Sequence, residues 1–211
     1  MKIKKHRADF PLLYLASQSP RRKEILKRMG LRFRVVPSKY HEKKIPGLSV
    51  TELILAHALG KARAARLPKR KGIVLGSDTV VYRRGRILGK PGSKKEAVEM
   101  LRFLSDREHS VYTGVVLYCP ETRKTLVKYD RTRVYFKKLT PQDIERYLQD
   151  VHVLDKAGSY AIQEGRRIVK KIKGSYSNVV GLPSELLSRM LLDWQKKVDK
   201  KGCRRKGQKI Q

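Results

Sequence analysis

Basic and acidic side chains occur at several boundaries between apolar runs and loops, where they could handle phosphate groups. Residues 17–22 read Ser-Gln-Ser-Pro-Arg-Arg and follow the apolar run 12–16. The Ser-Pro pair suits the N-cap and first position of a helix, whose free amides and positive dipole end favour an anion. Arg21 and Arg22 add guanidinium groups, which bind phosphate bidentately and keep their charge. A di- or triphosphate ligand is one interpretation, and a capped helix with solvated arginines is an equally good one.

A single acid lies in the segment 76–81, Gly-Ser-Asp-Thr-Val-Val. Asp78 is expected at the end of a strand over 73–76 and before a second strand over 80–88. A carboxylate in this place can bind a divalent metal or activate a water, and both are needed when hydroxide attacks an electron-rich phosphate. Asp followed by Thr is also ordinary turn chemistry, so spacing alone favours a hairpin turn.

Lysines and a further acid complete the set of charged candidates. Residues 89–92, Gly-Lys-Pro-Gly, hold Lys90 in a rigid loop, where it could neutralise the charge that grows on a departing phosphate group. Lys61 falls on a predicted helix over 49–66, and Glu42 falls in the loop before it. In a chain with 51 Lys and Arg residues, an isolated lysine more often faces solvent.

Small residues dominate two segments near the C-terminal end, 154–163 and 174–183. Their glycines allow a close approach of the backbone to a ligand. The amide of Gln163 could pair with the edge of a base through one donor and one acceptor. A glycine-rich structural connection into the last helix explains the same composition.

Apolar periodicity predicts a mixed β-sheet flanked by helices. Helix signals include a capping box of Ser49 with Glu52, a second of Ser93 with Glu96, and prolines that open two later helices. The expected helices cover 20–29, 49–66, 93–104, 140–148 and 183–194. The expected strands cover 12–16, 33–36, 73–76, 80–88 with a turn at Arg84 and Gly85, 110–118 and 125–136. We therefore expect one α/β domain over residues 1–194, followed by a basic, disordered tail over 195–211.

Composition restricts the environment and the partners. The formal net charge of +32 attracts polyanions such as nucleotides and nucleic acid. Cys119 and Cys203 form no disulfide framework or metal-type spacing, which fits a reducing compartment. No segment reaches the roughly 20 apolar residues that span a bilayer, and the N-terminus is unlike a signal peptide, so a cytoplasmic protein without membrane contact is expected.

Several enzyme classes lose support from motifs that the sequence lacks. No Walker-type phosphate loop occurs, and no Gly-x-Gly-x-x-Gly follows a predicted strand. The five histidines are scattered without the spacing of zinc ligands. An ATP-driven motor, a Rossmann dehydrogenase and a zinc enzyme are therefore disfavoured.

Four short motifs together resemble the Maf family of nucleotide pyrophosphatases. They are residues 15–22, 77–79, 89–91, and the C-terminal block 156–163 with 174–183, in this order over residues 12–192. The resemblance implies an α/β fold with a long mixed sheet, two lobes with a nucleotide cleft between them, and often a homodimer. It also implies hydrolysis of nucleoside triphosphates at the α-phosphorus, with Mg²⁺ or Mn²⁺.

The same resemblance implies roles for individual residues. Asp78 would orient or deprotonate the attacking water, and Asp78 and Glu42 would hold the metal. The phosphates would be held by Ser17, Arg21, Arg22, Lys61 and Lys90. Such a reaction needs little covalent chemistry from the protein, only placement of water, metal and cations around the phosphorus.

Three positions bear on the base. One branch of the family prefers dTTP, UTP and modified pyrimidine nucleotides, and a 7-methyl-GTP branch departs from it at the positions of Arg21, Thr79 and Gln163. The residues present here favour the dTTP/UTP branch, with a 7-methyl-GTP or broad-specificity enzyme as the alternative. Glu164, where many relatives have glycine, departs from the pattern and bears on base recognition.

A second class of function follows from the charge, which the family does not imply. A nucleic-acid-binding or septum-linked regulatory protein on the same fold would use the basic surface and the tail. The basic residues lack the interleaved aromatic residues of single-strand binders. The sequence therefore favours the enzyme over a pure binder.

Overall fold

The computed structural model describes residues 10, 12–43, 45–68, 72–164 and 167–199. In the described residues, helices are interspersed with single strands and with two pairs of consecutive strands, and two short helical segments, η3 and α5, lie near the C-terminal end. The elements are β1 (Leu13–Leu15), α1 (Pro20–Arg28), β2 (Phe33–Val35), α2 (Val50–Arg63), β3 (Ile73–Arg83), β4 (Arg86–Leu88), α3 (Lys94–Leu104), β5 (Glu108–Tyr118), β6 (Thr125–Phe136), α4 (Pro141–Asp150), η3 (Ala157–Ser159), β7 (Val169–Lys173), α5 (Tyr176–Val180) and α6 (Ser184–Asp199).

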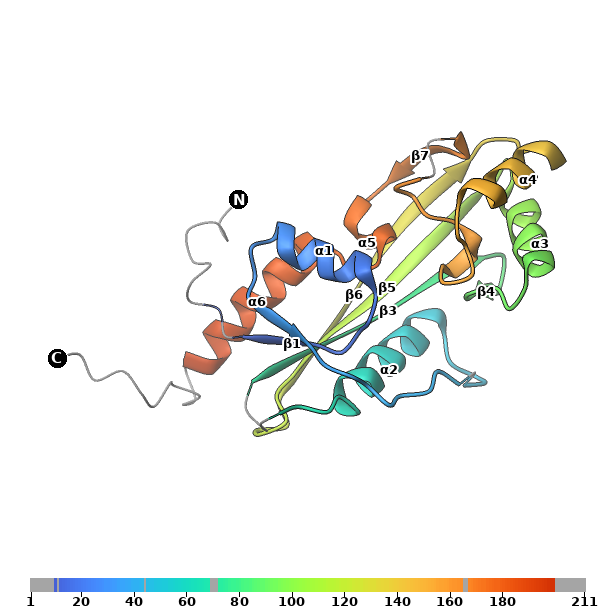
Figure 1. Cartoon of the computed structure of the whole chain (residues 1–211). Helices are drawn as coiled ribbons and strands as arrows, with labels where there is room; N and C mark the ends of the chain where they lie inside the picture. Colours follow the sequence, from blue (N-terminus) through green and yellow to red (C-terminus); the bar gives the residue numbers. More distant parts are fainter. Residues whose placement is uncertain (1–9, 11, 44, 69–71, 165–166, 200–211) are drawn as a thin grey trace.

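The strands form one mixed sheet of seven strands (Figure 1). Its order is β2-β1-β3-β5-β6-β7, and β4 pairs with β3 as a short hairpin partner. β1 is parallel to both β2 and β3, whereas β3, β5, β6 and β7 pair antiparallel. The expected α/β fold with a mixed central sheet is therefore confirmed.

Helices cover both faces of the sheet near β1. The central strands carry apolar side chains on both faces there, and both faces are buried by helices. Leu13, Leu15 and Leu75 pack with α1 and α6 on one face, while Tyr14 and Val74 pack with α2 on the other. Figure 1 shows α2 on the opposite side of the strands from α1 and α6.

Glycine lets α2 approach the sheet closely. A Cβ atom at Gly76 would lie 2.1 Å from the carbonyl oxygen of Ala58, and one at Gly114 would lie 2.8 Å from that of Ile54. A side chain at either position would push the helix away from the strands. The position of α2 thus depends on these two residues.

A second apolar cluster lies farther along the long strands. Val81, Val111 and Val134 pack there with α3 and α4. The two-residue period places Val81 on the same face as Leu75, so α3 and α4 share a face with α1 and α6. The two lobes that the resemblance implied stay a prediction, although the separate apolar clusters at the two ends agree with it.

Most predicted helix starts are confirmed, with one difference in the caps. Ser49 and Glu52 form the full capping box of α2. At α3, the Ser93 side chain accepts from the Glu96 amide, but the Glu96 carboxylate accepts from the amide of Gly92, 2.7 Å away. This second capping box is therefore only half formed, because Gly92 competes for the carboxylate.

The prediction of a turn at Asp78 is wrong. The two strands expected over 73–76 and 80–88 are one continuous strand, β3, and a hairpin with β4. The turn predicted at Arg84 and Gly85 is confirmed, because both residues have positive φ and the chain reverses there between β3 and β4. Asp78 stays in the strand because it is paired with Gly114 of β5, a long-range contact that overrides local turn preference. β7 and α5 were not predicted.

The C-terminal prediction is corrected in part. α6 continues to Asp199, so the first five residues of the stretch expected to be disordered are helical. Residues 200–211, the remainder of that stretch, lie outside the described residues. None of the helices in the described part of the chain has the length and apolar content to cross a membrane.

Candidate active site

The site lies where the edge of β3 is open. β1 pairs with β3 only as far as Leu75, and β4 pairs with it only from Val81 onward. Residues 76–80 of β3 therefore have a partner strand on one side only among the described residues, namely β5. Side chains that alternate along this segment point to opposite faces but border the same opening. Asp78 faces α2, and Thr79 faces α1 and α5.

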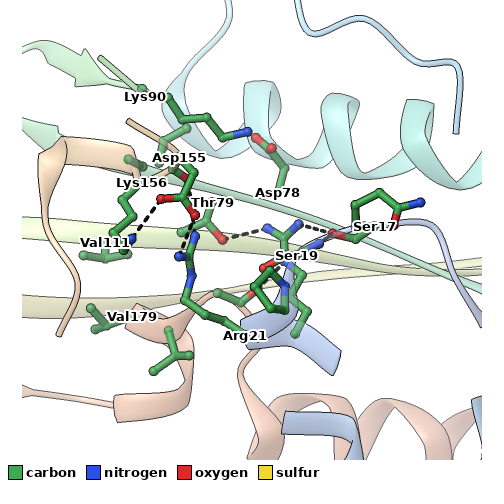
Figure 2. Close-up of a pocket in the computed structure, with 18 of the residues that line it drawn as sticks. Ser17, Ser19, Arg21, Asp78, Thr79, Lys90, Val111, Asp155, Lys156 and Val179 are labelled. Atoms are coloured by element: carbon green, nitrogen blue, oxygen red, sulfur yellow. Dashed lines mark hydrogen bonds and ion pairs between the residues drawn. The ribbon is translucent and has the colours of Figure 1, made fainter. Parts of the chain in front are cut away.

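A pocket of about 460 Å³ occupies this opening (Figure 2). Its walls come from the segment after β1, the loop before α2, the open edge of β3, the loop before α3 and the segment 155–163. Its lining includes all the residues that the sequence predicted for the site, Ser17, Arg21, Arg22, Glu42, Lys61, Asp78, Thr79, Lys90 and Gln163. The structure thus brings the predicted residues together, while the role of each stays a prediction.

Two carboxylates share one lysine in the pocket. Lys61 Nζ lies 2.6 Å from Asp78 Oδ1 and 2.6 Å from Glu42 Oε1. The side chain of Asp78 is only 5% exposed, and its Oδ2 atom is buried without a hydrogen-bond partner. Burial alone would raise the pKa of Glu42, but the charge and hydrogen bond of Lys61, followed by Lys90, lower it below its ordinary value. The cluster is therefore a carboxylate pair held by a cation.

Lys90 approaches this cluster from the loop between β4 and α3. Figure 2 shows its side chain extended toward the carboxylate of Asp78. The amide of Gly158 donates a hydrogen bond to the carbonyl of Gly89, 2.9 Å away, and this contact ties the loop to η3. Lys90 is an exposed residue, so its ammonium group can reach an anion in the pocket mouth.

Arg22 is held by the protein on all sides of its guanidinium group. Nε donates to the carbonyl of Gly181 at 2.8 Å, Nη1 to Ser17 Oγ at 3.0 Å and Nη2 to Thr79 Oγ1 at 3.2 Å. Burial lowers the pKa of Arg22, and the attraction of Asp78 and Glu42 opposes that effect. Arg22 thus joins α1, β3 and the segment before α6, besides placing a positive charge at the pocket wall.

Arg21 has a partner that sequence reasoning did not single out. Its Nη1 atom donates to Asp155 Oδ2 at 2.9 Å, and Nη2 donates to the carbonyl of Asp155 at 3.3 Å (Figure 2). Burial by itself would raise the pKa of Asp155, but Lys156 and Arg21 lower it. The only available signal was the acid directly before Lys156, in a segment chosen for its glycines.

Tyr40 and His57 support the carboxylate pair and were also missed. Tyr40 Oη and His57 Nδ1 lie 2.8 Å apart, and the Tyr40 ring packs on Gly60, where a Cβ atom would lie 2.2 Å from it. Burial, followed by the charges of Asp78 and Glu42, raises the pKa of Tyr40. This contact fixes the loop that carries Glu42 against α2. Glycine at position 60 was the only hint in the sequence.

The N-terminus of α1 also borders the pocket. Ser19 makes no side-chain capping hydrogen bond, and Pro20 takes the first position of the helix. The amide of Ser19 donates instead to Ser17 Oγ at 3.3 Å. The amides of the first helical turn therefore have no capping side chain, which suits a bound anion.

The carboxylate pair fits a hard divalent cation that a ligand helps to bind. Within the described ranges there is no group of three or more His, Cys, Asp and Glu side chains that could hold a metal. Mg²⁺ is often bound through one or two carboxylates together with substrate phosphates and water. Asp78 Oδ2, buried and without a partner, and Glu42 provide that number of carboxylates.

The fold and the site together define an α/β protein with a cationic, carboxylate-bearing pocket at an open strand edge. The chain belongs to the Maf-like protein family, whose pattern it matches over residues 12–194. It is 47% identical over 172 residues to the dTTP/UTP pyrophosphatase of Moorella thermoacetica, covering 81% of this chain and 89% of the relative.

Other relatives carry the same name. The chain is 41% identical over 180 residues to the dTTP/UTP pyrophosphatase of Pelotomaculum thermopropionicum, which covers 85% of this chain and 94% of the relative. It is 43% identical over 190 residues to that of Bacillus cereus strain ATCC 10987, with 90% and 93% covered. The similarity thus extends over nearly the whole of each relative.

Proposed function

We propose that this protein is a nucleoside triphosphate pyrophosphatase that converts dTTP and UTP to the monophosphate and pyrophosphate. The observation that carries the proposal is the buried carboxylate of Asp78, paired with Lys61 and Glu42 in a pocket rich in cations. Relatives named dTTP/UTP pyrophosphatase, similar over most of their length, support the same reaction.

Each part of the pocket supplies one requirement of phosphoanhydride hydrolysis. Asp78 accepts a hydrogen bond from the attacking water and orients it toward the α-phosphorus. Lys90 at the pocket mouth and the free amides of α1 stabilise the charge on the phosphate oxygens. Arg22 keeps Thr79 and Ser17 in place, so the walls around the phosphates are rigid before the nucleotide binds.

We further propose that Asp78 and Glu42 hold Mg²⁺ or Mn²⁺ together with the nucleotide phosphates. The cation would neutralise phosphate charge and polarise the phosphorus centre. Lys61 keeps the two carboxylates close together and compensates their mutual repulsion while no cation is bound.

We assign base selection to Arg21, Thr79 and Gln163, which all line the pocket. Gln163 and Arg21 line the pocket, and Asp155 fixes the guanidinium of Arg21. Thr79 is fixed as well, since its hydroxyl lies 3.0 Å from that of Thr113. A fixed set of polar groups can reject a base that leaves one of them unpaired. In the alternative, a 7-methyl-GTP or broad-specificity enzyme, these side chains would have to form hydrogen bonds with a different base.

A panel of nucleoside triphosphates tests this proposal. dTTP, UTP, CTP, ATP, GTP and 7-methyl-GTP are assayed with Mg²⁺ for both pyrophosphate and orthophosphate. We expect pyrophosphate as the product and a kcat/KM for dTTP and UTP about tenfold or more above the others. Preference for 7-methyl-GTP would overturn the base assignment, and release of orthophosphate would overturn cleavage at the α-phosphorus.

The wider expectations about the protein stay predictions. They are a homodimer, a cytoplasmic location, and nucleic-acid contacts made by the basic surface and the tail. The residues of the tail beyond Asp199 lie outside the described part of the chain.

A further inference from the structure

At and beyond the N-terminal end of α2, the sheet carries exposed basic side chains and the exposed ring of Tyr129, whereas Tyr112 and Ser110 of the same face are buried. Figure 1 shows β3, β5 and β6 extending past this helix toward α3 and α4. On the side of the sheet that carries α2, the strand registers align Tyr82, Ser110, Arg133 and Lys173 in one row across four strands. Arg133 and Lys173 in this row are exposed. We call this surface the tyrosine face.

Four tyrosines lie on the tyrosine face, and their rings are in contact or flanked by cations. The rings of Tyr82 and Tyr112 are 6.1 Å apart, edge to face, and those of Tyr112 and Tyr129 are 6.4 Å apart. Tyr129 is 47% exposed, so one side of its ring is available to a ligand. Tyr135 is the fourth tyrosine, and the strand register places it opposite Lys171 of β7.

Basic side chains alternate with these rings. The guanidinium of Arg131 lies 5.5 Å from the centre of the Tyr112 ring and donates to Ser110 Oγ at 3.0 Å. Lys171 and Lys173 place their ammonium groups 4.8 and 6.0 Å from the centre of the Tyr135 ring. The folded sheet therefore interleaves aromatic and basic residues that are separated along the sequence.

We infer that the tyrosine face binds single-stranded nucleic acid, separately from the nucleotide pocket. Single-strand binders combine a positively charged surface that follows the phosphates with aromatic rings on which bases stack. The tyrosine face provides both, with Tyr129 as the most exposed ring and Lys171 and Lys173 as phosphate contacts. Unlike the sequence-based interpretation, which missed the aromatic residues, this inference rests on strand registers.

The charge of the surface favours nucleic acid over a second copy of the chain. Four exposed basic residues, Arg131, Arg133, Lys171 and Lys173, lie on the tyrosine face together with the acid Glu108, whereas Asp130 of the same registers lies on the opposite face. Glu108 is already engaged, because its Oε1 atom lies 3.9 Å from Arg133 Nη1 and its carboxylate accepts a hydrogen bond from Tyr135. A two-fold dimer through this face would place like charges opposite one another, which is unfavourable.

The test uses the full chain and a fluorescent twenty-nucleotide oligothymidine, with a duplex of equal length for comparison. Tyr129→Ala is expected to weaken single-strand binding about fivefold or more, as for loss of one stacked base, and to leave duplex binding unchanged. Tyr176→Ala is the matched control, since Tyr176 on α5 is also 47% exposed. It is expected to leave both affinities unchanged.

Charge is tested through the salt dependence of the same binding. Lys171→Gln with Lys173→Gln should reduce the slope of log affinity against log salt by about 1.4, or 0.7 for each phosphate contact. Lys94→Gln with Lys95→Gln, on the exposed start of α3, removes equal charge and should leave the slope unchanged. Pyrophosphatase turnover should stay at the wild-type level in all four variants, which confirms that they are folded.

Three results would overturn the inference. The first is an equal effect of Tyr129→Ala and Tyr176→Ala on single-strand binding. The second is an equal change of slope for the two lysine pairs, which would show that only global charge matters. The third is a wild-type dimer in sedimentation that Tyr129→Ala dissociates, because the face would then belong to a second copy.

Discussion

Lys61 Nζ lies 2.6 Å from Asp78 Oδ1, and the same nitrogen lies 2.6 Å from Glu42 Oε1. The lysine comes from the last turn of α2, and Asp78 comes from the centre of β3. Their contact depends on the close packing of α2 on Gly76. Catalytic geometry and core packing are therefore coupled at this point of the sheet.

Lys61→Met should destabilise the protein, because it leaves the buried Asp78 carboxylate without its cation. We expect a loss of roughly 3 kcal/mol in the free energy of unfolding, measured with urea. Lys27→Met, in the exposed last turn of α1, is the matched control and should cost far less. Equal losses in the two variants would mean that the Lys61 pair does not contribute to stability.

Glu42→Gln should weaken metal binding, since it removes one of the two carboxylates available for a cation. The Mg²⁺ concentration for half-maximal activity should rise about tenfold or more. Mn²⁺ binding, followed by electron paramagnetic resonance with a non-hydrolysable dTTP analogue, should weaken in parallel. Glu99→Gln, an exposed acid on α3, serves as the control. Unchanged metal dependence would remove Glu42 from the cation site.

Arg22→Lys keeps the positive charge but cannot reach Gly181, Ser17 and Thr79 together. Each hydrogen bond to a charged group contributes about 1.5 to 3 kcal/mol, so a loss of roughly 2 kcal/mol in stability is expected. KM for dTTP should rise as well, because the pocket walls lose their common contact. Arg28→Lys, at an exposed ion pair with Glu24, should change neither quantity. Normal stability and normal KM in Arg22→Lys would contradict this role.

Gly76→Ala should move α2 away from β3, because the new Cβ would lie 2.1 Å from the carbonyl oxygen of Ala58. Overpacking of this kind costs about 1 to 3 kcal/mol, and turnover should fall with the displacement of Lys61. Gly89→Ala is the control, since nothing lies within 4 Å of its added Cβ. Calorimetric unfolding of both variants measures this loss of stability. A wild-type unfolding temperature for Gly76→Ala would show that the close approach is dispensable.

The sequence was sufficient for the longer helices, although not for the short α5, because their start signals are local. The Ser49–Glu52 capping box and the Pro20 start both lie within four residues of the structure that they specify. The sequence was insufficient for β3, since the continuity of a strand through Asp78 depends on pairing with β5. That contact links residues more than thirty positions apart along the chain.

Most of the candidate site residues lie in four ordered motifs, and Glu42 and Lys61 were proposed from the family resemblance outside them, but the partners of these residues were not predictable. Asp155 and Tyr40 lie outside the four motifs. Asp155 contacts Arg21 and Tyr40 contacts His57, and each contact joins segments that are separated along the chain. The tyrosine face was missed for the same reason, because its rows run across strands and not along them. Long-range strand pairing thus determines side-chain contacts that local sequence patterns do not predict.

Release of pyrophosphate from dTTP by Asp78→Asn, compared with wild type and Asp106→Asn, tests the central claim most directly. Asp106 is an exposed acid outside the pocket, so its variant should keep normal turnover. Because Asp78 orients the attacking water, we expect Asp78→Asn to lose about a thousandfold in kcat while it still folds and binds dTTP. Turnover near the wild-type rate in a folded Asp78→Asn protein would contradict the account.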